Sequence, residues 1–273
     1  TSMNIPTIQL EAGDITNGGT YDDVVRHSIS RLSHLLLTTN KDSQQRLIKQ
    51  GEEKWRVNNI GVSSLSKIKN KKYASKIEIK KKFHINFDKP IIIFTFHPLS
   101  LNISKTKKHI KICVESLIAL SKIVNVIITY PNDDYGSKYI ISEYKKLKKY
   151  KNIFLIKSLG KYFYHSLMNL NLQKKHRIFC MGNSSSGIKE AVFFNCYSIN
   201  LGERQLNRMK LNNVINKKVD KKSIMFSVKK LLKKDFGKNF KNPFYKENSI
   251  NNFFDIVKKN FDNKFKLLNK KYF

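Results

Sequence analysis

A serine-rich stretch in the second half of the chain combines residue types that can hold a phosphorylated ligand. It consists, in order, of Asn183, Ser184, Ser185, Ser186, Gly187, Ile188, Lys189 and Glu190. Small residues let the backbone approach a ligand closely, free N–H groups at a helix start attract anions, and serine hydroxyls add donors. The Glu190 carboxylate can accept two hydrogen bonds from a ribose diol. Phosphate followed by ribose indicates a nucleotide, although an ordinary serine-capped helix would contain the same serines.

Acidic residues and one histidine elsewhere in the chain can reach the same place. Glu11 and Asp14 follow a predicted strand, and so do His97 and the serine-rich stretch. Ligands of open parallel sheets bind outside the carboxyl ends of the strands, so these side chains are expected to converge on one cleft. For His97, the plain alternative is a histidine whose hydrogen bonds are satisfied at a strand end.

A second group of charged residues lies on one predicted helix. Asp22, Asp23, Arg26 and His27 stand at spacings of three and four residues, which place them on one helix face. They form either a functional patch of charges or a surface helix with internal salt bridges. Taken alone, the spacing favours the surface helix.

Alternating strands and helices position these residues in the first part of the chain. The predicted strands are residues 5–10, 34–39 and 56–61, and the predicted helices are residues 22–32 and 43–50. Gly18 and Gly19 mark a turn, and Gly51 closes the second helix. This alternation predicts a parallel sheet that is covered on both faces.

The alternation continues after a Lys-rich stretch, residues 63–88, which is expected to connect two domains and to contain a helix. The later strands are predicted at residues 91–96, 125–130, 153–157, 177–180 and 198–201. The later helices are predicted at residues 103–123, 137–149, 162–170, 188–194, 221–233 and 249–268. We interpret the chain as an α/β protein with two Rossmann-like domains that face each other across a cleft.

The composition of the 273-residue chain is that of a folded protein with a sizeable core. Hydrophobic residues make up 40% and charged residues 27%, as in ordinary globular domains. No apolar run is long enough for a membrane span, and no secretory signal or metal-ligand cluster is recognised. The widely spaced Cys113, Cys180 and Cys196 are typical of reduced, buried thiols. We therefore expect a cytoplasmic protein without a membrane partner.

The net charge of +33 is unusual. Such a field attracts polyanions, so a nucleic-acid-binding protein is an alternative. The lysines, however, are spread over nearly every predicted element and accompany many Asn and Ile residues. They are most simply solvated faces and loops, and no specific nucleic-acid partner is expected.

The motifs together resemble the UDP-N-acetylglucosamine 2-epimerases, most of all the hydrolysing branch used in sialic and nonulosonic acid synthesis. The nucleotide-binding domain of that family is resembled by residues 183–191, residues 200–205 and Arg208. Its first domain is resembled by residues 11–14, 18–19, 22–27, 35–40 and 55–61. The resemblance extends, with gaps, from around Ile5 to around Pro243. It implies two Rossmann-like domains around a cleft, a GT-B-like fold.

The resemblance implies a reaction on a UDP-activated 2-acetamido sugar, with no cofactor and no metal. A base removes the C2 proton while UDP leaves C1, water adds at C1 of the glycal-like intermediate, and a proton returns to the opposite face of C2. From UDP-N-acetylglucosamine, the products would be UDP and N-acetylmannosamine. The family commonly forms homo-oligomers.

The resemblance also implies roles for individual residues. Acid and base catalysis is expected among Glu11, Asp14, Asp22 and Asp23, and His97 is expected to contact the diphosphate or the intermediate. Ser184, Ser185 and Ser186 would hold the phosphates and Glu190 the ribose. The other expected binding residues are Arg26, His27, Asn183, Gly187, Arg204 and Arg208.

Part of the family pattern has no counterpart in this sequence. The first strands and helices of the family's first domain are missing, with a Gly/Arg-containing loop and a catalytic aspartate. The first domain is therefore expected to be truncated at its N-terminus. The expected division is residues 1–62 for the first domain, 63–88 for a linker, 89–248 for the nucleotide-binding domain and 249–273 for a helix that packs back on the first domain. The alternatives are a non-hydrolysing epimerase, a glycosyltransferase of the same fold and an inactive relative.

Overall fold

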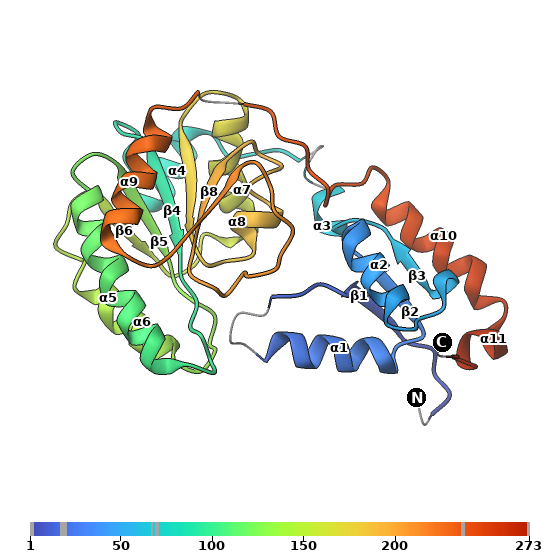
Figure 1. The fold of residues 1–273 in the computed structure, drawn as a ribbon. Coiled ribbons are helices and arrows are strands. Elements are labelled where there is room, and N and C mark those ends of the chain that lie inside the picture. Colours follow the sequence, from blue (N-terminus) through green and yellow to red (C-terminus); the bar gives the residue numbers. More distant parts are fainter. Residues whose placement is uncertain (1–2, 17–20, 67, 69–70, 236–237, 272–273) are drawn as a thin grey trace.

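The computed structural model describes residues 3–16, 21–66, 68, 71–235 and 238–271, and it contains two parallel β-sheets surrounded by helices (Figure 1). The turn expected at Gly18 and Gly19 lies outside the described residues. Strands and helices alternate along the chain in both halves, because the apolar strand runs are separated by amphipathic helical stretches. The α/β interpretation with two Rossmann-like domains is confirmed.

In the described residues, the first sheet has the strand order β1-β2-β3 with parallel pairing. Its elements are β1 (Ile8–Ala12), α1 (Asp22–Leu32), β2 (Leu35–Thr38), α2 (Lys41–Lys49), the 3₁₀ helix η1 (Lys54–Arg56) and β3 (Val57–Asn59). Helix α1 begins with two acids and has Arg31 in its last turn, which matches the helix dipole. Helix α2 begins at Asn40, whose side chain accepts a hydrogen bond from the Ser43 N–H.

Helix α1 buries a polar side chain and exposes apolar ones, which is the opposite of an ordinary surface helix. Ser30 is buried against β1, where its hydroxyl donates to Gln9 Oε1 at 2.6 Å. The apolar residues Val24, Val25, Ile29 and Leu32 are exposed instead, Val24 to 69%. An amphipathic helix normally buries its apolar side, so this face of α1 leaves apolar area in water.

The second sheet has the strand order β6-β5-β4-β7-β8-β9, and every neighbouring pair is parallel. Its strands are β4 (Ile91–Thr95), β5 (Asn125–Thr129), β6 (Ile153–Ile156), β7 (Ile178–Gly182), β8 (Tyr197–Leu201) and β9 (Val214–Lys217). The chain leaves β4 toward β5 on one side and returns beside β4 with β7 on the other. The carboxyl ends of β4 and β7 therefore mark the switch point where ligands of such sheets bind.

Helices cover both faces of the second sheet (Figure 1). One face is covered by α5 (Ile103–Leu120), α6 (Ser137–Lys145) and α9 (Lys221–Leu232). The other is covered by α4 (Lys76–Phe83), α7 (Gly160–Leu172) and α8 (Ser186–Lys189). Strand β4 shows why both faces are apolar, because Ile92 and Phe94 enter the first cluster and Ile91 and Ile93 the second.

The two segments that join the sheets are folded. The stretch 63–88 carries α3 (Ser63–Ser66) and α4, and its buried Leu65, Ile79 and Ile85 belong to the apolar cluster beneath the second sheet. The C-terminal segment carries α10 (Ser249–Phe261) and α11 (Lys264–Leu268) and returns to the first sheet. There the fully buried Arg56 donates hydrogen bonds to the carbonyls of Leu267 at 2.6 Å and Asn269 at 2.8 Å.

Some predicted elements need correction. The helix expected at residues 188–194 is the single turn α8, Ser186–Lys189, after which turns lead to Asn195 with φ +54°. The run Ala191–Phe194 is apolar because it packs in the core, not because it continues a helix. Strand β9 was not predicted, β1 lies further along the chain than residues 5–10, and the helix expected at 249–268 is divided into α10 and α11.

Two further observations concern the whole described chain. Cys113, Cys180 and Cys196 are free and buried, and burial raises the pKa of the Cys180 thiol to about 12. Among the described residues, none of the helices has the length and apolar character that crossing a membrane requires.

Candidate functional site

A polar cavity of about 270 Å³ lies between the carboxyl ends of the two sheets. Apart from Val62, the residues that line it have polar or charged side chains. They are Glu11, Thr16, Asp22, Arg26, Val62, Ser64, Asn132, Ser185, Ser186, Lys189, Glu190, Arg204 and Arg208. Both domains contribute, as expected for a cleft-binding protein. A ligand here would be recognised through hydrogen bonds and charge more than through apolar contact.

The serine-rich stretch lies directly after β7 and reaches the cavity through Ser185 and Ser186. Ser186 Oγ is 3.0 Å from Ser184 Oγ and 2.9 Å from the Tyr164 hydroxyl, so these hydroxyls form a connected group. Ser185 stands at the N-cap of α8, but its hydroxyl makes no capping bond and so is available to a ligand. Because α8 is one turn long, its dipole adds little, and any phosphate would rely on these hydroxyls and the nearby cations.

Two glycines allow this turn to pack closely. Gly182 has φ +130°, and a Cβ there would lie 1.9 Å from the carbonyl oxygen of Thr95 on the neighbouring strand. At Gly187, a Cβ would lie 2.7 Å from Ser198 Oγ. Glycine is therefore required where β7 ends, and at Gly187 it lets α8 sit against β8.

Glu190 lines the cavity and is held by a histidine that the sequence did not reveal. His165, on α7, is almost completely buried, and its Nε2 lies 2.5 Å from Glu190 Oε2. His165 Nδ1 has no hydrogen-bond partner among the described residues. The contact fixes one carboxylate oxygen of Glu190, which leaves the other free to accept a bond from a ligand hydroxyl.

The carboxylates of the first sheet meet cations of the second. Glu11 has φ +57° at a register shift in β1, which takes it out of the strand pairing. Glu11 Oε2 and Asp14 Oδ2 each lie 2.7 Å from Nζ of Lys189, and Asp14 also pairs with Arg208. Burial acts to raise the pKa of Asp14, but Lys189 and then Arg208 outweigh it, and the pKa lies below its usual value.

The charged residues of α1 divide into two groups. Asp23 accepts bonds from the N–H of Thr16 at 2.9 Å and the hydroxyl of Thr16 at 2.8 Å, and it pairs with Arg26 at 2.8 Å. Asp22 and Arg26 line the cavity, and Asp22 lies 3.8 Å from Arg204. His27 is not among the lining residues. Asp23 therefore holds Thr16 beside the cavity, and the part of α1 that borders the cavity is formed by Asp22 and Arg26.

His97 and Asn183 lie beneath the cavity and are not among its lining residues. His97 Nδ1 accepts a bond from the N–H of Asn132, which places the ring proton on Nε2. Burial, followed by the charge of Arg204, lowers the pKa of His97 to about 3. The ring is therefore neutral at physiological pH. It can donate a hydrogen bond but cannot supply a positive charge to a diphosphate.

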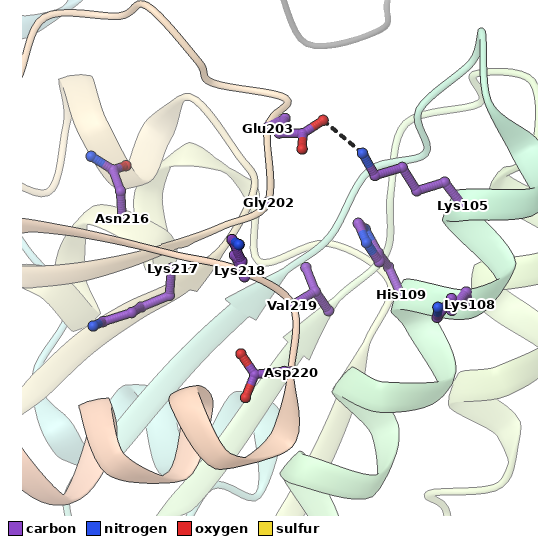
Figure 2. A pocket seen from close by; sticks show the side chains of 10 residues that line it. All are labelled: Lys105, Lys108, His109, Gly202, Glu203, Asn216, Lys217, Lys218, Val219 and Asp220. Atoms are coloured by element: carbon purple, nitrogen blue, oxygen red, sulfur yellow. Dashed lines mark hydrogen bonds and ion pairs between the residues drawn. The ribbon is translucent and has the colours of Figure 1, made fainter.

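A larger cavity, about 690 Å³, lies elsewhere on the second domain (Figure 2). It is bounded by the first turns of α5, the ends of β8 and β9, and the start of α9, and it includes Lys105, His109 and Lys218. Its size exceeds that of the cleft, but it takes no residue from the first domain and no predicted site residue. Lys105 is already paired with Glu203 at 2.6 Å.

The site contains residues that were not predicted to take part, chiefly Lys189, His165, Tyr164, Thr16 and Asn132. Only Lys189 stood within the serine-rich stretch, and its neighbours gave no reason to single it out. Among the described residues, no cluster of three His, Cys, Asp or Glu side chains could hold a metal ion.

The arrangement of two parallel α/β domains with a polar cleft between them is the GT-B-like architecture. A family model described as UDP-N-acetylglucosamine 2-epimerase matches residues 1–258, and the chain belongs to this family.

Two curated relatives and one solved structure illustrate the similarity. The GDP/UDP-N,N'-diacetylbacillosamine 2-epimerase (hydrolyzing) of Campylobacter jejuni is 35% identical over 240 residues, which are 87% of this chain and 60% of the relative. The UDP-N,N'-diacetylbacillosamine 2-epimerase (hydrolyzing) of Legionella pneumophila is 30% identical over 233 residues, which are 85% of this chain and 59% of the relative. The co-structure of S. aureus MnaA with UDP matches with a TM-score of 0.74 at 18% identity, covering 96% of this chain and 69% of that chain.

The structural and the sequence comparisons support different conclusions. At 18% identity, the structural likeness supports the fold alone. The curated relatives support membership of the family, with hydrolysing enzymes among them. The chain spans about 60% of the length of these relatives.

Proposed function

We propose that this protein acts as a hydrolysing 2-epimerase of a UDP-activated 2-acetamido sugar, such as UDP-N-acetylglucosamine. The observation that carries the proposal is the meeting of two sets of groups at one cavity. Glu11 and Asp22 come from the first domain, and Ser185, Ser186 and Glu190 come from the second. Asp14 is not a lining residue but contacts Lys189, which is. The names of the curated relatives support the same activity.

In this proposal the second domain holds the nucleotide. The hydroxyls of Ser185 and Ser186 donate to the diphosphate, and the Glu190 carboxylate accepts from the ribose hydroxyls. Arg204 and Arg208, both largely buried at the cavity, supply positive charge to the departing UDP. Fixed donors and cations of this kind stabilise a leaving group most when water is excluded from around them.

The first domain supplies the carboxylates that move protons. One carboxylate removes the C2 proton as UDP leaves C1, and the C1–O bond electrons depart with UDP. Water then adds at C1 of the glycal-like intermediate, and a carboxylic acid returns a proton to the opposite face of C2. We assign these roles among Glu11, Asp14 and Asp22, and not to Asp23, which is bonded to Thr16 and Arg26. The free 2-epimer would enter sialic or related nonulosonic acid synthesis in the cytoplasm.

UDP binding is the first test of the proposal. We would measure it by calorimetry for the wild-type chain and for Ser185→Ala and Glu190→Ala. Glu143→Ala, on α6 and not among the residues that line the cavity, serves as the matched control. Weaker but still measurable binding by both cavity variants, with normal binding by the control, is the expected result. A folded wild-type chain that fails to bind UDP would contradict the proposal.

Product analysis then separates the candidate reactions. Release of free UDP together with a 2-epimerised sugar is expected for the hydrolysing enzyme. A UDP-bound 2-epimer would instead indicate the non-hydrolysing reaction, and UDP binding without turnover would indicate an inactive relative. Sedimentation of the same preparation tests the expected homo-oligomer.

A further inference from the structure

Lys189 is a buried cation that bridges the two domains. It is the last residue of α8, its side chain is 8% exposed, and its Nζ contacts Glu11 Oε2 and Asp14 Oδ2, each at 2.7 Å. Lysine is almost never buried unless it is paired. Here both partners are carboxylates of the opposite domain and both are candidates for proton transfer, so Lys189 connects the nucleotide side of the cleft to its catalytic side.

The two carboxylates differ in their surroundings. The Glu11 side chain is 52% exposed and borders the cavity, whereas the Asp14 side chain is 8% exposed. Asp14 Oδ1 also accepts a bond from the Ile15 N–H at 3.1 Å, while Oδ2 faces both Lys189 and Arg208. The same lysine therefore holds one carboxylate at the edge of the cavity and the other deeper in the protein.

The charged groups around Asp14 come from four elements. Lys189 lies on α8, Arg208 follows β8, and Arg26 on α1 donates to the Asp14 carbonyl at 3.2 Å. Arg46 on α2 donates to the carbonyl of Gly13 next to it. Burial works against a charged Asp14, and Lys189 is the foremost of the cations that oppose it. Removing Lys189 leaves this burial less compensated.

We infer that Lys189 is a positioning residue that holds Glu11 and Asp14 at the cleft and keeps the Asp14 carboxylate charged. For the reaction, this inference rests on the proposed function. In that reaction Asp14 is the carboxylate of the pair that is deprotonated when turnover begins. The lysine does not touch the reacting atoms in this scheme. It acts through the two carboxylates, and its loss changes the pH at which Asp14 titrates.

The test is a titration of Asp14 by NMR with ¹³C-labelled aspartate, with the signal assigned by its loss in Asp14→Asn. In Lys189→Met the midpoint of Asp14 moves up by about 1 to 3 pH units, as expected when one close opposite charge is lost. Lys189→Arg moves it back toward the wild-type value. Lys105→Met, which removes a lysine that is paired with Glu203 and does not line the cleft, leaves it unchanged. If Lys189→Met does not fold, Lys189→Gln takes its place.

An unchanged Asp14 midpoint in a folded Lys189 variant overturns the inference, whether or not the protein turns over substrate. A second readout is the pH profile of kcat/KM for UDP release from UDP-N-acetylglucosamine. Lys189→Met moves its low-pH limb to higher pH, and Lys189→Arg restores it, whereas a purely structural role lowers kcat/KM at every pH alike. Absence of turnover in the wild type would count against the proposed function, and the titration would still decide the role of Lys189.

Discussion

Asn183 binds the backbone of His97 through both ends of its side-chain amide. Its Oδ1 accepts from the His97 N–H at 2.6 Å, and its Nδ2 donates to the His97 carbonyl at 2.8 Å. The carbonyl of Asn183 in turn accepts from Gln205 at 2.9 Å and from Arg204 at 3.3 Å. One buried asparagine thus joins the ends of β4 and β7 and the loop that carries the cavity arginines. We therefore propose a supporting place for Asn183 in nucleotide binding, because its side chain is buried against the backbone of His97.

Asn183→Asp should destabilise the protein. The substitution keeps the acceptor but replaces the donor with an oxygen that faces the His97 carbonyl, which costs about 1 to 3 kcal/mol for a buried unsatisfied group. Urea unfolding at pH 7 measures the change. Asn212→Asp, at an exposed position, serves as the control and should be close to neutral. Equal stability of the two variants would show that the hydrogen bonds of the Asn183 amide to His97 do not stabilise the fold.

His165→Phe should weaken UDP binding without abolishing it. The phenyl ring fits a site that already contacts Phe194, but it no longer fixes the Glu190 carboxylate. A loss of about 1 kcal/mol, roughly fivefold in Kd, is expected for one hydrogen bond. Calorimetry in the wild-type and Glu190→Ala backgrounds forms a double-mutant cycle. If His165→Phe weakened binding as much in the Glu190→Ala background, the histidine would not be acting through Glu190.

Stability should fall as the pH drops below about 6.5, in part because of His97. The folded protein holds the pKa of His97 near 3, below the unfolded value of 6.5, so between these values the unfolded chain binds the extra proton. The contribution of neutral His97 to the free energy of unfolding is complete above about pH 6.5 and is lost progressively toward pH 3. Urea midpoints measured from pH 4 to 8 should therefore decline less steeply for His97→Gln than for the wild type. Identical slopes would mean that His97 is charged in the folded state.

The exposed apolar face of α1 should promote self-association. Val24→Lys together with Ile29→Lys places charges on positions that are already in water, so the fold should persist while association weakens. Sedimentation velocity over a range of concentrations provides the measurement. Ser30→Lys, on the buried face of the same helix, should instead destabilise the first domain. Association that is unchanged in the double variant would place the contact elsewhere.

Regular elements with local signals were predictable from the sequence. Helix α1 begins and ends where expected, at Asp22 and Leu32, because acids in its first turn and Arg31 in its last mark both ends. Strand β9 was missed because Val214–Lys217 is short and half polar, and it becomes a strand only through pairing with β8. Helix α8 was expected to be longer because the apolar core run Ala191–Phe194 resembles a continuation of its apolar face.

The site residues that belong to one sequence motif were predictable, whereas those brought together from distant parts of the chain were not. Ser185, Ser186 and Glu190 reach the cavity, as the spacing within their stretch predicted. Glu11, one of the two partners of Lys189, lies 178 residues earlier in the chain, and in a sequence with 53 Lys and Arg residues any lysine is expected to be solvated. His165 was hidden in the same way, because a histidine on an apolar helix gives no sign of the carboxylate that it meets.

The contacts of Arg56 also fix when the first domain can be completed during synthesis. Its fully buried guanidinium donates hydrogen bonds to carbonyls of residues 266–269, in addition to Glu53 and the carbonyl of His34. Those residues leave the ribosome after the strands of the second sheet have emerged and can fold. Until then the Arg56 guanidinium remains hydrated, and the sheet of β1, β2 and β3 lacks the C-terminal segment that packs against it. Without residues 266–269, Arg56 would keep only Glu53 and the carbonyl of His34 as hydrogen-bond partners among the described residues, so the first domain reaches its final stability only after the second has been made.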